Sequence, residues 1–344
     1  MKRCIELAMQ GAAYVAPNPM VGAVLVYENR IIGEGYHQIY GGPHAEVNCI
    51  ASVSEEDKGF ISSSTMYVSL EPCAHHGKTP PCSDLLISNR VARVVVGCRD
   101  PFHAVNGKGI EKLHAAGIEV TTGVLEEECT ALNKRFFTYH KQHRPYIILK
   151  WAQTADGKIG NIGNSRLMIT NELTNRLVHK WRSEEMGIMI GTNTAGLDNP
   201  RLTNRWWFGK NPVRIVVDSQ LSLPPSLKIF VEDGAVIVFN LHKHGETKNK
   251  KYYQVSEDAS LVHQVLNGLY TMNIQSILVE GGARLLQSFI DDESWDEARV
   301  ITNERLTLKE GVAAPVLCNE ALEYEERISN DRIRYYTRTN KITA

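Results

Sequence analysis

Four residues in the first quarter of the chain have the types and spacing of a hydrolytic zinc centre. His44 is followed two residues later by Glu46, and Cys73 and Cys82 each come directly after a proline. One imidazole and two thiolates can hold Zn²⁺ and leave its fourth tetrahedral position for water, whose pKa the metal lowers to about 7. In zinc deaminases, a glutamate that is not a ligand carries the proton from this water to the departing amine. The pattern predicts His44, Cys73 and Cys82 as metal ligands and Glu46 as the catalytic acid–base.

Short secondary-structure elements must bring these four residues together. Hydrophobic periodicity predicts a helix at residues 46–51, a buried strand at 65–70 and a helix at 83–89. His44 and Glu46 would then lie in the first turn of a helix, Cys73 just after a strand, and Cys82 at the start of the next helix. Helix N-termini stabilise thiolates, and thiolates with an imidazole favour zinc over iron.

Several polar residues near this centre have two interpretations. His75 or His76 could close the metal as a fourth ligand, which would make the zinc structural and leave Glu46 without a role. Asn18 and His37 precede the centre and could line its approach. A turn-capping asparagine and a surface histidine would explain these two residues equally well.

The remaining pattern of the first half alternates between strands and helices, which predicts an α/β fold with parallel strand pairs. A hairpin of residues 21–27 and 31–36 would make the sheet mixed. The later elements expected are strands at 91–97 and 118–120 and helices at 107–116 and 125–139. The polar run at 140–145 then suggests a boundary between domains 1–142 and 145–344.

The second half is predicted to be α/β as well, with a polar loop at residues 192–201. Its main chemical feature is a strand that ends at Glu280 and runs through Gly281-Gly282 into a helix. Free N–H groups at such a helix N-terminus can bind phosphate, although Gly-Gly can also be a simple tight turn. Arg182, Arg201 and Arg205 could clamp a phosphate, or each could be a solvated surface charge.

Composition excludes several classes of protein. The 344 residues are 43% hydrophobic and 22% charged with a net charge of −1, so the chain lacks the basic footprint of a nucleic-acid-binding protein. No stretch approaches the ~18 apolar residues of a membrane span, and the N-terminal region lacks the apolar run of a signal peptide. Seven scattered cysteines fit a reducing compartment. We therefore expect a cytoplasmic protein.

The chain resembles the bifunctional riboflavin-biosynthesis deaminase–reductases of bacteria over essentially its whole length. Eight residues separate Cys73 from Cys82, where cytidine and tRNA-adenosine deaminases usually have two. The shared motifs are Pro17-Asn18-Pro19, His44-Ala45-Glu46, residues 72–82, Lys150 with Asp156-Gly157, residues 198–203, residues 214–219 and Val279-Glu280-Gly281-Gly282.

The resemblance implies two domains and two reactions. A cytidine-deaminase-like α/β/α sandwich with a mixed sheet would remove the 2-amino group of a phosphoribosylated diaminopyrimidine with zinc. A dihydrofolate-reductase-like α/β domain would then reduce the ribosyl group with NADPH. The family also implies a homo-oligomer, either a dimer or a tetramer, with a small-molecule substrate and no nucleic-acid or membrane partner.

The resemblance also assigns residues to the two sites. The deaminase substrate contacts fall on Asn18, His37, His75 and Lys78. The reductase substrate contacts fall on Arg166, Arg182, Leu202, Arg205 and Glu280. Lys150 matches a polar position near the reaction centre, and we expect it to be catalytic, by orienting the ribose or assisting protonation. The cofactor contacts fall on Ala152, Met168, Thr194, Asp198, Ser219, Gly282, Ala283, Arg284, Leu285, Leu286, Gln287 and Ser288.

The chain departs from the family pattern at one place. Met168 stands where the family often has tryptophan, and Arg166 where it has serine. One alternative is therefore an active deaminase with a degenerate reductase. A nucleic-acid base deaminase and a zinc-stabilised binding module are two further alternatives.

Overall fold

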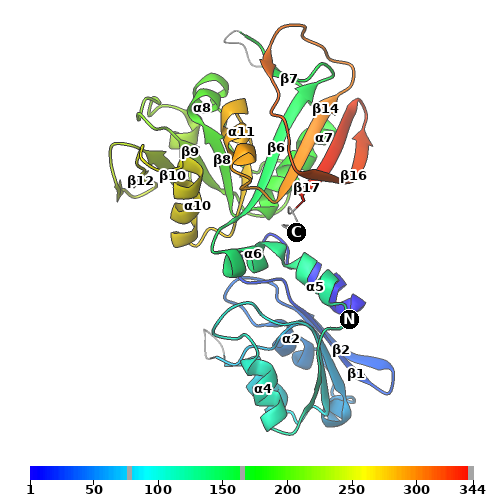
Figure 1. The fold of residues 1–344 in the computed structure, drawn as a ribbon. Coiled ribbons are helices and arrows are strands. Elements are labelled where there is room, and N and C mark those ends of the chain that lie inside the picture. The colour runs from blue at the N-terminus through cyan, green and yellow to red at the C-terminus, as the bar shows by residue number, and fades with distance from the viewer. Residues whose placement is uncertain (76–79, 163–166, 340–344) are drawn as a thin grey trace, which may run out of the picture. The chain divides into compact units, whose positions relative to one another are not determined.

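The computed structural model describes residues 1–75, 80–162 and 167–339. The chain forms two compact units, Met1–Gln142 and His143–Ala344, which are called unit 1 and unit 2 below (Figure 1). Lys78 and Arg166 lie outside the described residues. Each unit has its own sheet and its own buried core.

Unit 1 is built on a five-stranded mixed sheet in the order β2-β1-β3-β4-β5. The expected hairpin forms β1 and β2, and β1 runs antiparallel to β3, whereas β3, β4 and β5 are parallel. The strands are β1 (Gly22–Tyr27), β2 (Arg30–Tyr36), β3 (Thr65–Leu70), β4 (Arg93–Cys98) and β5 (Glu119–Thr121).

Helices cover both faces of this sheet. One core cluster joins the sheet to α2, α3 and α4, and two others join the opposite face to α1, α5 and α6. The helices are α1 (Lys2–Met9), α2 (Ala45–Ala51), α3 (Cys82–Ser88), α4 (Lys108–Ala115), α5 (Glu126–Leu132) and α6 (Lys134–Gln142), with a 3-10 helix at Lys58–Ser63. The expected α/β sandwich with a mixed sheet is confirmed.

Unit 2 is built on a ten-stranded mixed sheet in the order β11-β12-β10-β9-β8-β13-β6-β14-β17-β16. Seven neighbouring strands from β12 to β14 are parallel, and antiparallel strands flank them at both ends. The strands are β6 (Tyr146–Thr154), β8 (Gly187–Gly191), β9 (Val213–Val217), β10 (Val236–Asn240), β11 (Gly245–Glu246), β12 (Lys250–Gln254), β13 (Ser276–Val279), β14 (Glu297–Asn303), β16 (Glu320–Ile328) and β17 (Asp331–Arg338); β7 (Lys158–Gly160) and β15 (Val312–Ala313) pair separately.

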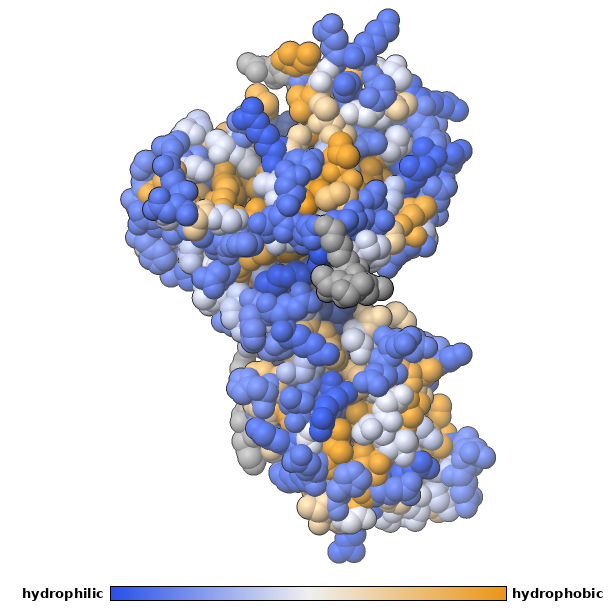
Figure 2. Space-filling view, in the orientation of Figure 1, coloured by the Kyte–Doolittle hydropathy of each residue, from blue (hydrophilic) through white to orange (hydrophobic). Residues whose placement is uncertain are grey.

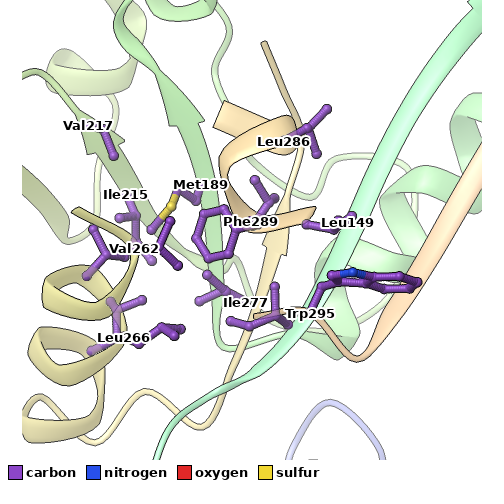
Figure 3. Close-up of a cluster of buried hydrophobic side chains, with 14 of the residues drawn as sticks. Leu149, Met189, Ile215, Val217, Val262, Leu266, Ile277, Leu286, Phe289 and Trp295 are labelled. Atoms are coloured by element: carbon purple, nitrogen blue, oxygen red, sulfur yellow. The ribbon is translucent and has the colours of Figure 1, made fainter. Parts of the chain in front are cut away.

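The largest core of unit 2 lies between the sheet and helices α10 and α11 (Figure 3). Alternate residues of β6 enter this core, among them Leu149, while their neighbours face α7 on the other side. Phe289 of α11 and Trp295 are almost wholly buried. The helices are α7 (Glu172–Glu184), α8 (Thr192–Asp198), α9 (Lys228–Val231), α10 (Leu261–Thr271) and α11 (Ala283–Asp291).

Two sequence-based expectations about elements were wrong. The single helix expected at 125–139 is broken into α5 and α6 at Asn133, whose side chain accepts a hydrogen bond from Met20 N and donates one to Met20 O, both at 2.8 Å. The polar loop expected at 192–201 contains helix α8. This helix forms because it buries Ala195 completely in the core, a tertiary contact that outweighs the polar composition.

Hydrophilic side chains cover much of the face shown in Figure 2, with apolar residues in scattered groups between them. Within the described residues, no helix is long and apolar enough to cross a lipid bilayer.

Candidate active sites

The predicted metal ligand His44 and its neighbour Glu46 are placed by the start of α2. His44 is the N-terminal cap residue of this helix, and Glu46 lies in its first turn with only 3% of its surface exposed. Helix α2 packs closely on β2, because a Cβ atom added at Gly35 would lie 2.2 Å from Cys49 N. Glycine therefore permits the close contact that fixes the height of α2 over the sheet.

The two cysteines reach His44 from other elements. Cys73 follows β3 by three residues, and Cys82 begins α3. His44 Nδ1 lies 3.6 Å from Cys73 Sγ and 3.3 Å from Cys82 Sγ, and the three ligand atoms lie within 4.8 Å of one another. Tetrahedral zinc with ordinary bond lengths separates a sulfur from a nitrogen by about 3.6 Å. The donor set and its spacing therefore fit zinc.

The protein's own groups prepare these side chains for their roles. A hydrogen bond from Cys82 and the nearby His44 lower the pKa of Cys73 although the thiol is largely buried. Burial, together with the negative charge of Cys73, raises the pKa of Glu46 to about 7. A carboxyl group with this pKa can both accept and release a proton near neutral pH.

Asn18 and His37 form a hydrogen-bonded pair beside His44. His37 Nδ1 lies 2.9 Å from Pro43 O, so this nitrogen must donate, and Nε2 then accepts from Asn18 Nδ2 at 3.1 Å. Burial and the neighbouring His44 lower the pKa of His37, which is 2% exposed. The surface interpretation of His37 is therefore wrong.

His75 is exposed, and its ring lies against Phe102 with the centroids 5.9 Å apart. It is not a member of the metal-binding group found among the described residues. The alternative fourth ligand His76 and the predicted substrate contact Lys78 both lie outside the described residues.

The reductase residues converge beside β6. The register of β13 and β6 pairs Val279 with Leu149, which places Glu280 next to Lys150. Arg182 of α7 donates from Nε and Nη2 to the two oxygens of Glu280 at 2.8 and 2.6 Å. Burial opposes ionisation of Glu280, but the charges of Arg182 and Lys150 outweigh it and lower its pKa to about 2. Burial also lowers the pKa of Lys150.

A second arginine joins this group through Thr203. Arg182 Nη1 donates to Thr203 O at 3.3 Å, and Arg205 Nη1 donates to Thr203 Oγ1 at 2.8 Å. His179 Nδ1 accepts from Arg205 N at 2.9 Å. Burial lowers the pKa of His179 to about 4, with smaller contributions from the positive charges of Arg182 and Arg205. Leu202 is buried with a left-handed backbone, φ 56°.

The predicted cofactor residues meet where α8 and α11 begin. Thr194 Oγ1 accepts from Gly282 N at 2.9 Å, and Gly282 is the cap residue of α11. The first turn of α11, Ala283 to Leu285, therefore lies beside α8, which also carries Asp198. Ser219 follows β9, and its carbonyl accepts from Leu241 N at 2.9 Å.

Six of the predicted cofactor residues have individual placements that bear on this role. Leu286 is fully buried in the core, so its side chain is unavailable to a cofactor. Gln287 donates to Asp291 at 2.8 Å, and Ser288 donates to Leu285 O at the same distance, while Arg284 is exposed. Met168 is 60% exposed, and Ala152 packs partly against the core on the α7 side of β6.

Three residues of these sites were missed from the sequence. Glu71, His179 and Thr203 are each less than 9% exposed; His179 accepts from Arg205, Thr203 accepts from Arg182, and Glu71 accepts from backbone N–H groups such as Gly107 N. Thr203 lies in the motif at residues 198–203, but the sequence did not mark any of the three as a site residue, because their roles depend on contacts with other segments.

Two family models match the chain, one on each unit. Residues 1–98 match the cytidine and deoxycytidylate deaminase zinc-binding region, and residues 145–306 match the RibD C-terminal domain. Fold and sites together define a zinc-dependent deaminase joined to a reductase.

Relatives and solved structures extend over almost the whole chain. The riboflavin biosynthesis protein RibD of Aquifex aeolicus is 39% identical over 97% of this chain and 94% of that protein; the RibD of Actinobacillus pleuropneumoniae is 40% identical over 83% and 77%. A diaminohydroxyphosphoribosylaminopyrimidine deaminase/5-amino-6-(5-phosphoribosylamino)uracil reductase of Thermotoga maritima has 38% identity and a TM-score of 0.88, covering 98% of this chain and 97% of that one. Acinetobacter baumannii RibD has 29% identity and a TM-score of 0.89, covering 98% of both chains.

The chain belongs to the RibD family of riboflavin biosynthesis proteins. It is a deaminase and a reductase of riboflavin biosynthesis that uses zinc and NADPH. The alternatives of a nucleic-acid base deaminase and a degenerate reductase are not favoured.

Removing one cysteine tests the metal centre. We expect Cys82→Ala to lose its zinc and its release of ammonia, because two remaining ligands hold the ion poorly, while unit 2 still oxidises NADPH when it is given the deaminated product. Zinc content measured by atomic absorption and the two turnover rates check this. Cys129→Ala removes another buried thiol of unit 1 and should keep its zinc. Full zinc in the Cys82 variant would contradict the ligand assignment.

The low pKa of Glu280 predicts how acid affects unit 2. Ionised Glu280 stabilises the fold above its ordinary pKa of 4.5, and this stabilisation is lost as the pH falls towards about 2. Glu280→Gln leaves Arg182 buried without its partner, so we expect a loss of about 3–5 kcal/mol in the free energy of unfolding at neutral pH. Urea unfolding should show this difference shrinking towards pH 3.

The matched control for this experiment is Glu325→Gln, which removes a surface carboxylate paired with Arg334. It should cost less than about 1 kcal/mol at any pH. A Glu280 difference that stays constant from neutral to acid pH would show that the carboxylate charge is not its source.

Proposed function

We propose that unit 1 hydrolyses the 2-amino group of 2,5-diamino-6-(5-phosphoribosylamino)pyrimidin-4(3H)-one. Unit 2 then reduces the ribosyl group of the product with NADPH to give 5-amino-6-(5-phosphoribitylamino)uracil. The observation that carries this proposal is the presence, in one chain of this family, of a His-Cys-Cys group beside buried Glu46 and of a buried Arg182–Glu280 pair beside Lys150.

In the deaminase, His44, Cys73 and Cys82 hold zinc, which when bound makes a water molecule nucleophilic at neutral pH. Glu46 takes one proton from the attacking water and delivers it to the ring nitrogen, and then takes the second proton from the added hydroxyl and delivers it to the departing amine. Its burial beside the ligands suits this task, because a carboxyl group with a pKa of about 7 loses little free energy in either protonation state. Neutral His37, held by Pro43 O, keeps Asn18 at the edge of the site.

In the reductase, NADPH supplies a hydride to C1′ of the ribose when it is bound. The reacting form is an open-chain imine, an electrophile that needs no metal. Lys150 orients the ribose or assists protonation, and its closeness to Glu280 and Arg182 supports this role. Arg182, Arg205 and Glu280 contact the substrate. Thr194 and the first turn of α11 hold the cofactor, because free N–H groups there suit a phosphate.

We also propose that the protein works in the cytoplasm as a homo-oligomer, a dimer or a tetramer. This part of the proposal rests on the family alone, and size-exclusion chromatography with light scattering tests it.

A paired assay tests the proposed function. The purified protein is given the diaminopyrimidine phosphate with and without NADPH, and ammonia release and NADPH absorbance are followed. Ammonia without cofactor, followed by NADPH oxidation once it is added, is the expected result. Ammonia alone would mean that unit 2 does not reduce this product, and no ammonia from zinc-loaded protein would overturn the proposed substrate.

Glu46→Gln tests the proton carrier. The amide keeps the shape but can no longer take a proton, so we expect the deaminase kcat to fall by about 10²–10⁴-fold while bound zinc is retained. Glu55→Gln, a surface change in the same unit, should be neutral. A Glu46 variant with wild-type turnover would remove this residue from the mechanism.

Lys150→Met tests the reductase assignment. The change keeps the side-chain length but removes the charge and the proton, so kcat for NADPH oxidation should fall at least about a hundredfold. Ammonia release by unit 1 should be unaffected. Lys180→Met removes a lysine that pairs with Glu184 on the surface of α7 and serves as the control. Reduction at the wild-type rate in the Lys150 variant would refute its catalytic role.

A further inference from the structure

Glu71 is a buried carboxylate two residues before Cys73, with 4% of its surface exposed. Within the described residues, the hydrogen bonds that its oxygens accept come from the backbone of residues 100–110, the segment that leads from β4 into α4. Oε2 accepts from Asp100 N at 3.3 Å and Gly107 N at 2.9 Å, and Oε1 accepts from Gly109 N at 3.0 Å and Ile110 N at 3.4 Å. The four N–H groups share the buried negative charge, as charge-assisted hydrogen bonds do.

The chain around Glu71 is pressed directly against α4. A Cβ atom added at Gly109 would lie 1.9 Å from Pro72 O and 3.3 Å from the Glu71 carboxylate. Gly107, which caps α4, has φ 89°, in the left-handed region that favours glycine. These two glycines allow the segment from Glu71 to Cys73 and the start of α4 to be locked together without an intervening side chain.

Cys73 lies at the end of this segment, next to the other two predicted ligands. Its carbonyl accepts from Ser83 N at 3.1 Å, and its sulfur accepts from Cys82 N at 3.3 Å. The sulfur is therefore held from two sides, by the start of α3 after it and by the Glu71 anchor before it.

We propose that Glu71 is a positioning residue of the deaminase centre, whose carboxylate fixes the end of β3 to the start of α4 and so sets the sulfur of Cys73 relative to His44 and Cys82. The inference deepens the proposed function, because it takes Cys73 to be a ligand. It assigns Glu71 no proton transfer and no contact with metal or substrate.

The substitution Glu71→Gln tests this role because glutamine has the shape of glutamate but only one acceptor oxygen in place of two. Each carboxylate oxygen accepts from two backbone N–H groups, so an amide turned either way must place its own NH₂ group against two donors. Glu71→Gln therefore loosens the anchor without leaving a cavity.

The experiment measures metal affinity of the full chain rather than stability alone. We expect Glu71→Gln to weaken zinc binding by about 10–100-fold, the usual effect of removing a group that orients a metal ligand without touching the metal. Competition with a chromophoric chelator measures this affinity. The thiolate-to-metal absorption of the cobalt-loaded protein should shift, and NADPH oxidation by unit 2 with the deaminated product supplied should be unchanged.

Ser64→Ala is the matched control, since Ser64 is fully buried at the opposite end of β3 and donates to Phe60 O at 2.7 Å. It should lower the melting temperature but leave zinc affinity and the cobalt spectrum as in the wild type. If Glu71→Gln does not fold, Glu71→Asp, which keeps the charge but shortens the reach, takes its place with the same expectation.

The proposal is overturned if the folded Glu71 variant, Gln or Asp, binds zinc and cobalt like the wild type. A failure of the proposed function looks different: the wild type would bind metal normally and release no ammonia from the diaminopyrimidine phosphate. Metal affinity thus decides the role of Glu71, and ammonia release decides the substrate.

Discussion

The deaminase centre depends on placing three ligand atoms to within a few tenths of an ångström. Zinc accepts a nitrogen and two sulfurs only at tetrahedral spacing, about 3.6 Å from sulfur to nitrogen, and the ligands of this chain come from three separate segments. No single element can set such distances. They follow from the packing of α2 on β2, which Gly35 permits, and from the positions of β3 and α3 relative to it. The surrounding glycines and buried acids belong to the metal site as much as its ligands do.

Unit 2 depends on a different constraint, the burial of opposite charges beside β6. An ion pair that is removed from water stabilises a fold only when its geometry is good and its remaining hydrogen bonds are satisfied. Arg182 meets both conditions, because it forms two bonds with Glu280 and a third with Thr203 O. The pair then sets the charge felt by Lys150, so the network that stabilises unit 2 also sets the electrostatics of its site.

The sequence predicted the parts of both sites that obey local rules. His44, Cys73 and Cys82 could be found because metal ligation demands particular residue types at helix and strand ends, and the alternation of elements gave the fold class. The sequence could not show that the side chain of Asn133 forms hydrogen bonds with Met20 and interrupts a helix. Nor could it show that Ala195 is buried in a core, which makes the polar segment form α8. Glu71 and His179 were missed for the same reason. Their partners lie at least 26 residues away in the chain, and local patterns carry no trace of such pairs.

Two buried glutamates show how the same group can serve opposite purposes. The carboxylate of Glu71 is stabilised by hydrogen bonds from backbone N–H groups, and the fold fixes the positions of these groups. Glu280 is paired with the Arg182 side chain and feels the charge of Lys150, so its partners are charged side chains and not backbone groups. Backbone N–H groups that already hold a carboxylate cannot also take part in binding a ligand, whereas charged side chains beside a carboxylate are the groups proposed to contact a phosphorylated sugar. This difference explains why the first suits a positioning residue and the second a substrate contact.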